Sequence, residues 1–295
     1  MRRRCVSFLD ATSGAAYTRS QVNIELSSVH NRRVHPSGAL EQSIHDVWAA
    51  KLANNPRLFN GTKFRLAAFT ATPTSLHMEW GLTDYKTYLG LCSRCDVVSS
   101  LATPPNQDTT IYLSNKIGVA GALLTADDKV CFLKRSSVVG AYPNMLDVPG
   151  GHPEPEHIGI DWSSLPVEPD DATNRRCAAE FFDSIAVEIV EEVNVPSSTL
   201  SPPLLLGVTL QGEAATPSFA FVVRCNLDAS AIAAWYAQGP VDQYETTKLI
   251  FQPLQAALTS RSSGIMTPSA AGCFELLGRY LDYEPPTTRS SSSTT

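Results

Sequence analysis

Residues 174–194 read NRRCAAEFFDSIAVEIVEEVN and form the most strongly patterned segment of the sequence. At about 100° per residue, the apolar side chains of this segment fall on one arc of a helix. These residues are Ala178, Ala179, Phe182, Ile185, Ala186, Ile189, Val190 and Val193. Glu188, Glu191 and Glu192 fall on the opposite side, within an arc of roughly 100°. The pattern predicts a helix with one buried face and one face that carries three carboxylates.

The three carboxylates repel one another, because like charges three and four positions apart on a helix are neighbours. They also lie near the C-terminus of the helix, where the helix dipole disfavours negative charge. A divalent cation would compensate this repulsion, since hard cations prefer carboxylate oxygens. Taken alone, the helix is more simply interpreted as having a solvated acidic face, so the surrounding sequence has to decide.

The segments around this helix predict a mixed sheet. Upstream, residues 117–125 and 129–134 read as two strands joined by the turn sequence Ala-Asp-Asp. Downstream, strands are expected at 204–210, 218–225 and 247–251, and helices at 229–237 and 269–282. This order is typical of an α+β fold, with a mixed sheet packed between helices over residues 111–285.

A smaller α/β unit is expected over residues 21–110. Its predicted elements are a helix at 38–54, a hairpin of strands at 63–70 and 75–82, and a helix at 83–90 capped by Thr83 or Asp84. The segment 99–110, rich in Ser, Thr and Pro, is the best candidate for a linker. Residues 1–20 are expected to be flexible or to form a short edge strand, and residues 286–295 to form a disordered tail.

The composition argues against several classes of protein. The chain of 295 residues has a formal net charge of −6 and no long basic run, which disfavours nucleic acid as a partner. No stretch approaches about 18 consecutive apolar residues, so we expect no association with a membrane. The seven cysteines are dispersed, which suits a reducing compartment, so we expect an intracellular, cytoplasmic protein. The CxxC of Cys92 and Cys95 has no second pair, so structural zinc is not expected.

Residues 146–151, Leu-Asp-Val-Pro-Gly-Gly, precede the acidic helix. Together the two segments resemble the Nudix box, G-x5-E-x7-R-E-U-x-E-E-x-G-U, in which U is an aliphatic residue. Gly151 matches the first glycine, residues 188–192 match E-U-x-E-E, and Val195 matches the last aliphatic position. The resemblance implies a Nudix α/β/α sandwich, in which the glycines let the backbone turn tightly beside a metal site.

The resemblance also implies the chemistry. In this family the carboxylates of the helix hold Mg²⁺ ions, which polarise phosphates and activate water. Carried over to this sequence, Glu188 and Glu192 would bind Mg²⁺ and Glu191 would assist, all three as catalytic residues. Whether Glu188 or another carboxylate serves as the general base stays open.

The box of this sequence departs from the usual form in three ways. Gly151 and Val187 stand 36 positions apart, against 14 in the usual box, so about 22 residues are inserted. Val187 replaces the box arginine, and Asn194 replaces the last glycine. The early glutamate falls on His157. In the family, this glutamate and the arginine pair to brace the loop; here both are missing together, which avoids an unpaired charge.

A wider resemblance covers roughly residues 20–285. It is carried by GTKFRL (61–66), GLTDYKTYLG (81–90), GVAGALLTADDKVCFLKRS (118–136), LDVPGGHPEPE (146–156) and EEVNVPSSTLSPPLLLG (191–207). These segments are similar to the animal uridine diphosphate glucose pyrophosphatase branch of the Nudix superfamily. This implies Mg²⁺-dependent cleavage of UDP-glucose, and also UDP-galactose, to UMP and the sugar 1-phosphate. Two alternatives stay open: a non-catalytic nucleotide-binding module, and a hydrolase of another nucleoside diphosphate derivative such as an RNA cap.

Three further residues are candidates for contact with the substrate. Arg135 ends a predicted strand, and its guanidinium suits phosphate, although an exposed strand end is the simpler alternative. Asp147 precedes Pro-Gly-Gly, where it would either reach the substrate or stabilise a turn. Tyr85 would either stack on a base or pack in the core. If Tyr85 reaches the ligand, the N-terminal unit forms one wall of the pocket.

Other polar residues have simpler explanations. Lys63 and Arg65 alternate on a predicted strand and are expected on its solvated face rather than as anion contacts. Glu245 lies in a loop before a late strand, where Nudix enzymes often supply a further glutamate, although most loop glutamates have no such role. His152 and His157 lie in a polar insert and are expected to be solvated rather than to bind a transition metal.

Overall fold

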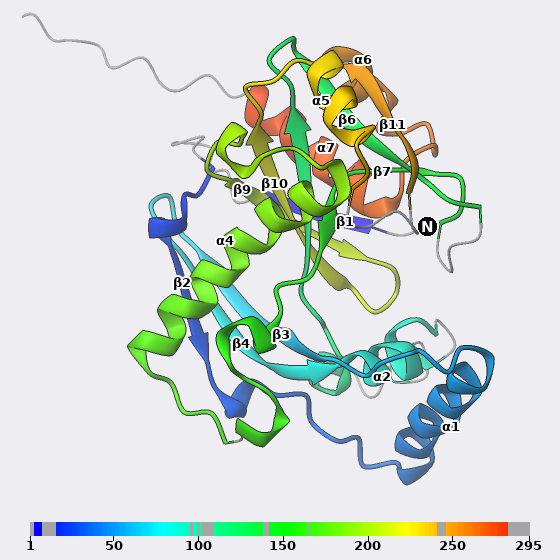
Figure 1. Ribbon diagram of the computed structural model, residues 1–295. Helices are drawn as coiled ribbons and strands as arrows, with labels where there is room; N and C mark the ends of the chain where they lie inside the picture. The colour runs from blue at the N-terminus through cyan, green and yellow to red at the C-terminus, as the bar shows by residue number, and fades with distance from the viewer. Residues whose placement is uncertain are drawn as a thin grey trace, which may run out of the picture.

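The computed structural model describes residues 3–7, 16–94, 97–98, 101, 109–137, 142–164, 166–240 and 246–282. The expected tail, most of the expected linker, Cys95 and Glu245 lie outside these residues. Within them, two β-sheets and the long helix α4 (Asp171–Val193) determine the architecture (Figure 1). None of the described helices is both long enough and apolar enough to cross a membrane.

The larger sheet has eight strands in the described part of the chain, in the order β1-β9-β10-β5-β6-β11, with β7 beside β6 and β8 beside β5. The strands are β1 (Arg3–Ser7), β5 (Gly118–Leu124), β6 (Lys129–Arg135), β7 (Leu146–Asp147), β8 (Gly150–Gly151), β9 (Leu204–Gln211), β10 (Thr216–Arg224) and β11 (Thr246–Pro253). β10 pairs with β5 in parallel and with β9 antiparallel, so the sheet is mixed, as predicted. Of the two expectations for residues 1–20, an edge strand is found in β1, which pairs with β9.

Alternate residues of β5 face opposite layers of helices, because successive side chains of a strand point to opposite faces. Val119 and Leu123 share a core with α4 and with Ile232 of α5 (Ala229–Tyr236). Ala120 and Ala122 share a core with α6 (Leu254–Ser260) and α7 (Pro268–Leu281). The sheet is therefore packed between helices, and the predicted α+β fold with an α/β/α sandwich is confirmed.

The smaller sheet contains β2 (Val22–Leu26), β4 (Leu76–Asp84) and β3 (Thr62–Ala71), with β2 parallel and β3 antiparallel to β4. The predicted helix at 38–54 is α1 (Gly38–Asn54), and the predicted hairpin is β3–β4. The helix predicted at 83–90 begins as α2 (Tyr85–Thr87), capped by Asp84, and continues as a π-helical turn, η3 (Tyr88–Cys92). β2 was not predicted from the sequence, although its alternating apolar residues fit a strand buried on one face.

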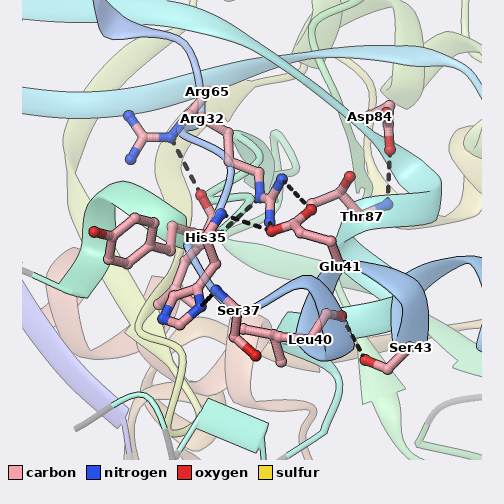
Figure 2. Close-up of polar contacts among 11 residues, drawn as sticks. Arg32, His35, Ser37, Leu40, Glu41, Ser43, Arg65, Asp84 and Thr87 are labelled. Carbon is pink, nitrogen blue, oxygen red and sulfur yellow. Dashed lines mark hydrogen bonds and ion pairs between the residues drawn. The ribbon is translucent and has the colours of Figure 1, made fainter. Parts of the chain in front are cut away.

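Buried polar contacts fix the segments around α1. Arg32 donates from Nη1 to Oε2 of Glu41 at 3.1 Å and from Nε to the carbonyl of Tyr112 at 2.8 Å (Figure 2). Arg65 is 3% exposed. Its guanidinium donates to three backbone carbonyl oxygens, those of His30, Thr110 and Leu113. The expectation that Arg65 lies on a solvated strand face is therefore wrong, because its guanidinium is buried and is satisfied by backbone carbonyl groups instead of water.

Helix α4 joins the two sheets in one hydrophobic core (Figure 1). The ring centroid of Phe181 in α4 lies 5.5 Å from that of Trp80 in β4 and 5.0 Å from that of Phe219 in β10. All three side chains are buried, and their edge-to-face contacts add to the stabilisation from burial. The two units expected from the sequence thus share a core, while the boundary between them at residue 110 stays a prediction.

This shared core generates a prediction for Phe181→Ala. The substitution should lower the free energy of unfolding by about 3–5 kcal/mol, because it leaves a cavity where both sheets meet the helix. Chemical denaturation followed by circular dichroism and by tryptophan fluorescence should give one coincident transition at lower denaturant. Val29→Ala is the control, since Val29 is 71% exposed. Two separate transitions, or a loss below about 1 kcal/mol, would contradict a shared core.

Candidate active site

Close packing brings α4 onto β5. A Cβ atom added at Gly121 of β5 would lie 2.8 Å from Cγ1 of Ile185 in α4. A Cβ atom added at Gly150 of β8 would lie 2.5 Å from the carbonyl oxygen of Val119. Glycine at both positions therefore allows the helix, the strand and the Gly150–Gly151 backbone to approach one another more closely than side chains would permit.

Two of the three predicted carboxylates converge on this glycine pair. Glu192 accepts a hydrogen bond at Oε2 from the backbone N–H of Gly150 at 3.0 Å. Oε1 of Glu188 would stand only 1.7 Å from a Cβ atom at Gly151, so its carboxylate occupies the space that a side chain would fill. Glu188 and Glu192 are half-buried, whereas Glu191 is exposed on the same helix. The structure thus brings Glu188 and Glu192 together at the glycines, with Glu191 at the solvated edge.

The donor set at the glycine pair fits a hard divalent cation. Both half-buried ligand candidates are carboxylates, and Gly151 leaves a cradle for one of them against the backbone. Among the residues that the structure describes, no three His, Cys, Asp or Glu side chains form a cluster able to hold a metal. Water or ligand oxygens would therefore have to complete the coordination of any cation held by these two carboxylates.

The substrate candidates Arg135 and Asp147 lie against each other. Nη1 of Arg135 donates to Oδ2 of Asp147 at 3.3 Å, and both side chains are largely buried. Asp147 also accepts at Oδ1 from the hydroxyl of Thr267 at 2.7 Å. Burial raises the pKa of Asp147, while the Thr267 hydroxyl and the Arg135 charge oppose this rise. Asp147 therefore connects β7 to the start of α7. It also lines a cavity beside the glycine pair.

A cavity of about 650 Å³ lies beside the glycine pair, where segments of both units meet. From the larger sheet it is lined by Gly118–Ala120, Asp147, Gly150 and Gly151, and from the N-terminal unit by Tyr88, Cys92 and Ser93. The size is typical of small-molecule sites. Tyr85 lines a second cavity of about 370 Å³ and stacks on Tyr88, with ring centroids 6.2 Å apart. The N-terminal unit thus contributes a wall to both cavities, through Tyr88 in one and Tyr85 in the other.

A buried glutamate that no motif singled out holds the inserted segment. Glu180 of α4 is 9% exposed and accepts at Oε1 from the backbone N–H of Glu154 at 2.8 Å. Nδ1 of His157 lies 3.0 Å from the same oxygen. Arg176 of α4 donates to the carbonyl of Ile158 at 2.8 Å. The loop is therefore held against the helix even though the usual glutamate–arginine pair is missing. The only sequence signal for Glu180 was that a charged residue stands between apolar residues of the predicted helix.

The two histidines of the insert, His152 and His157, were expected to be solvated, and this is correct only for His157. His157 has a side chain that is 62% exposed, as expected, although it contacts Glu180. His152 instead lines both cavities and contacts the ammonium of the buried Lys116. It is not a solvated residue, because the insert folds back against the segment that enters β5. Neither Lys116 nor this contact was predicted from the sequence.

Comparisons with known proteins were consistent with this site. No protein-family model matches the chain. The chain is 34% identical over 285 residues to the uridine diphosphate glucose pyrophosphatase NUDT22 of Homo sapiens, covering 93% of this chain and 92% of that protein. It is 33% identical over 258 residues to Nudix hydrolase 9 of Arabidopsis thaliana, covering 83% of each. A crystal structure of a NUDIX hydrolase from Alicyclobacillus acidocaldarius has 12% identity and a TM-score of 0.36, covering 55% of this chain and 90% of that one. This last likeness is too distant to inform the site.

The cradle at Gly151 generates a prediction for Gly151→Ala. The added methyl group should displace the Glu188 carboxylate and weaken divalent-cation binding about 10- to 100-fold, as loss of a positioning contact commonly does. Stability should change little, because the displaced carboxylate is half-buried and can rotate toward water. The measurement is a Mn²⁺ titration by calorimetry, together with a melting curve.

Gly118→Ala is the matched control for this variant. Gly118 lines the same cavity, but a Cβ atom there meets its nearest neighbour at an ordinary 3.6 Å. Cation binding by Gly118→Ala should therefore equal that of the wild type. If Gly151→Ala also binds the cation normally, Glu188 is not a ligand at this site.

Proposed function

The chain belongs to the Nudix hydrolase family, and from this premise we propose that it cleaves the pyrophosphate bond of UDP-sugars with Mg²⁺. The proposed substrates are UDP-glucose and UDP-galactose, and the products are UMP and the sugar 1-phosphate. The convergence of Glu188 and Glu192 on the Gly150–Gly151 backbone carries this proposal, because it retains the acidic centre of the box despite the long insert. The similarity to the human enzyme over most of both chains supports the choice of substrate.

Glu188 and Glu192 are the proposed Mg²⁺ ligands, and Glu191 is proposed to assist from the exposed edge of the helix. When bound, the metal supplies charge that polarises the phosphates and lowers the pKa of water. The backbone N–H of Gly150 holds Glu192 in one orientation. Glu180 holds the loop that follows the glycines. These contacts fix the carboxylates before substrate arrives, which favours an electrostatically preorganised site.

The proposed substrate contacts come from three elements. Arg135 would bind a phosphate oxygen, with its guanidinium held in place by Asp147. Asp147 would contact the substrate from the wall of the larger cavity. Tyr85 would bind the uracil or a hydroxyl group from the neighbouring cavity, through its ring face or its phenol. Water would attack one phosphorus, and the bridging oxygen would leave with the other product.

The departures at Val187 and Asn194 favour one other candidate, a non-catalytic module that binds nucleotides. A panel of nucleoside diphosphate sugars, with products identified by mass and Mg²⁺ titrated, separates the two. Release of UMP and sugar 1-phosphate that depends on Mg²⁺ supports the proposed hydrolase. Binding of the nucleotides without any product at saturating Mg²⁺ would identify the module instead.

Glu188→Gln and Glu192→Gln should each lower turnover by at least about 100-fold while the protein stays folded. Glutamine keeps the size of the side chain but loses the charge that a hard cation and a charged transition state need. The readouts are kcat at saturating Mg²⁺ and a melting curve. Glu168→Gln is the control, because Glu168 is an exposed glutamate of the insert. Near-normal turnover by Glu192→Gln would show that the metal site has been assigned to the wrong residues.

Tyr85→Ala should raise KM for UDP-glucose about 5- to 150-fold, because base–aromatic stacking contributes about 1–3 kcal/mol. The Mg²⁺ requirement should not change, since no metal ligand is altered. Tyr85→Phe keeps the ring and should retain a near-normal KM if stacking is the interaction. KM and the melting temperature should be measured on the same preparations. A Tyr85→Ala variant that melts lower but has an unchanged KM would make Tyr85 a packing residue.

A further inference from the structure

A buried lysine on the wall of the larger cavity has no role in the chemistry described above. Lys116 is 8% exposed and lies between η4 (Thr109–Tyr112) and β5, where it forms a β-bridge with Arg65 of β3. Its backbone is fixed there, because the N–H of Ile117 donates to the carbonyl of Phe64 at 2.9 Å. The Lys116 ammonium contacts Nε2 of His152 and lies 4.4 Å from the ring centroid of Tyr88. All three side chains line the cavity next to Gly150 and Gly151.

The surroundings of Lys116 do not neutralise its charge. Among the described residues, no carboxylate forms an ion pair with it. The charges of Lys63 and Glu154 also act on Lys116, in opposite directions, and these two side chains bind each other. A buried charge without a counter-ion destabilises the folded protein. The position is therefore costly unless something negative binds there.

The neutral groups around Lys116 stay neutral near pH 7. Burial raises the pKa of Tyr88 to about 12, so its phenol does not become a phenolate. Burial, followed by the charges of Lys116 and Lys63, lowers the pKa of His152 well below its ordinary value. Burial and then Lys63 lower the pKa of Lys116 itself to about 8, so the ammonium is still mostly charged at pH 7. On the described wall of the larger cavity, the positive charge of Lys116 is therefore held by the neutral imidazole of His152 and the ring face of Tyr88.

We propose that Lys116 binds a phosphate group in the larger cavity, with His152 and Tyr88 holding its ammonium in place. Phosphate oxygens are the natural counter-ions for a desolvated ammonium. The other charged residues described on this cavity wall are Asp147, which pairs with Arg135, and Glu213 of the β9–β10 turn. The ligand class is a phosphate ester or a diphosphate. Only the assignment of the natural ligand as a UDP-sugar rests on the proposed function.

The test is calorimetric binding of inorganic pyrophosphate to the full chain in EDTA, so that no metal bridges the anion. Lys116→Met should bind about 10- to 150-fold more weakly than the wild type, the range for losing a hydrogen bond to a charged group. Lys116→Arg keeps the charge and should retain most of the affinity. Lys248→Met is the matched control, because Lys248 is an exposed lysine of β11, and it should bind like the wild type. Equal binding by Lys116→Met and the wild type, or no binding by the wild type, would overturn the proposal.

Melting curves separate ligand binding from a structural role. Lys116→Met should melt at the same temperature as the wild type or higher, because the substitution removes an uncompensated buried charge. A melting temperature several degrees lower would assign the lysine to the fold and overturn the proposal. Uridine, UMP and glucose 1-phosphate then identify the source of the phosphate. If Lys116→Met binds UMP or glucose 1-phosphate more weakly than the wild type does, while uridine binds equally to both, the proposal is supported. The phosphate of the affected ligand is then the one that Lys116 binds.

The outcome is independent of the proposed substrate. If the wild type fails to hydrolyse UDP-glucose but Lys116→Met still loses pyrophosphate binding, the proposed function fails and the phosphate site stands. If UDP-glucose is hydrolysed and the variant binds pyrophosphate normally, the function stands and the Lys116 site fails.

Discussion

The close approach of α4 to the glycines of the larger sheet is the constraint on which the rest of the structure depends. Gly121 lets Ile185 pack directly on β5, and Gly151 leaves room for the Glu188 carboxylate. The same helix position therefore decides both the core packing and the geometry of the carboxylates. A shift of α4 by the width of a methyl group would separate Glu192 from the N–H of Gly150, because a hydrogen bond tolerates only a few tenths of an ångström.

The N-terminal half of α4 anchors the smaller sheet and the inserted loop. Asn174 accepts a hydrogen bond from the backbone N–H of Leu26 at 2.9 Å, which attaches the smaller sheet to the helix. Six positions along the helix, Glu180 holds the inserted loop. One rigid element thus positions the carboxylates, the insert and the N-terminal unit relative to one another. This arrangement explains how a box with about 22 extra residues keeps its acidic centre: the inserted segment is anchored to the helix that bears the ligands.

Charged groups of both signs lie near the glycine pair and the larger cavity. Arg135 and Asp147 form a pair, and Glu188 and Glu192 lie together beside the glycines. In the described part of the chain, no carboxylate forms an ion pair with the ammonium of Lys116. Concentrated and unbalanced charge is typical of sites that bind charged ligands. A phosphate near the lysine would reduce the cost of its buried charge. The proposed metal ligands and the proposed phosphate site would together suit a metal-bound diphosphate.

Local patterns in the sequence determined the secondary structure and the acidic helix face. The 100° rotation per residue places Glu188 and Glu192 on one face of α4. The two segments at 117–125 and 129–134, joined by a turn sequence, predict β5 and β6. Both signals depend only on neighbours along the chain. The mixed sheet between helices also followed from the order of these elements. Glu188, Glu192 and the glycine pair were found because a motif lists them, and the cradle at Gly151 agrees with that motif.

Tertiary structure alone decided the contacts between residues far apart in the chain. It paired Arg135 with Asp147, buried Arg65 beneath three carbonyl groups, placed Glu180 under the insert and brought His152 to Lys116. Each of these polar side chains reads from the sequence as a solvated or isolated group, since its partner lies at least 12 positions away. Which polar groups meet depends on how strands and loops are arranged in space. The periodicity of a single sequence reports only neighbours along the chain and therefore cannot predict these contacts.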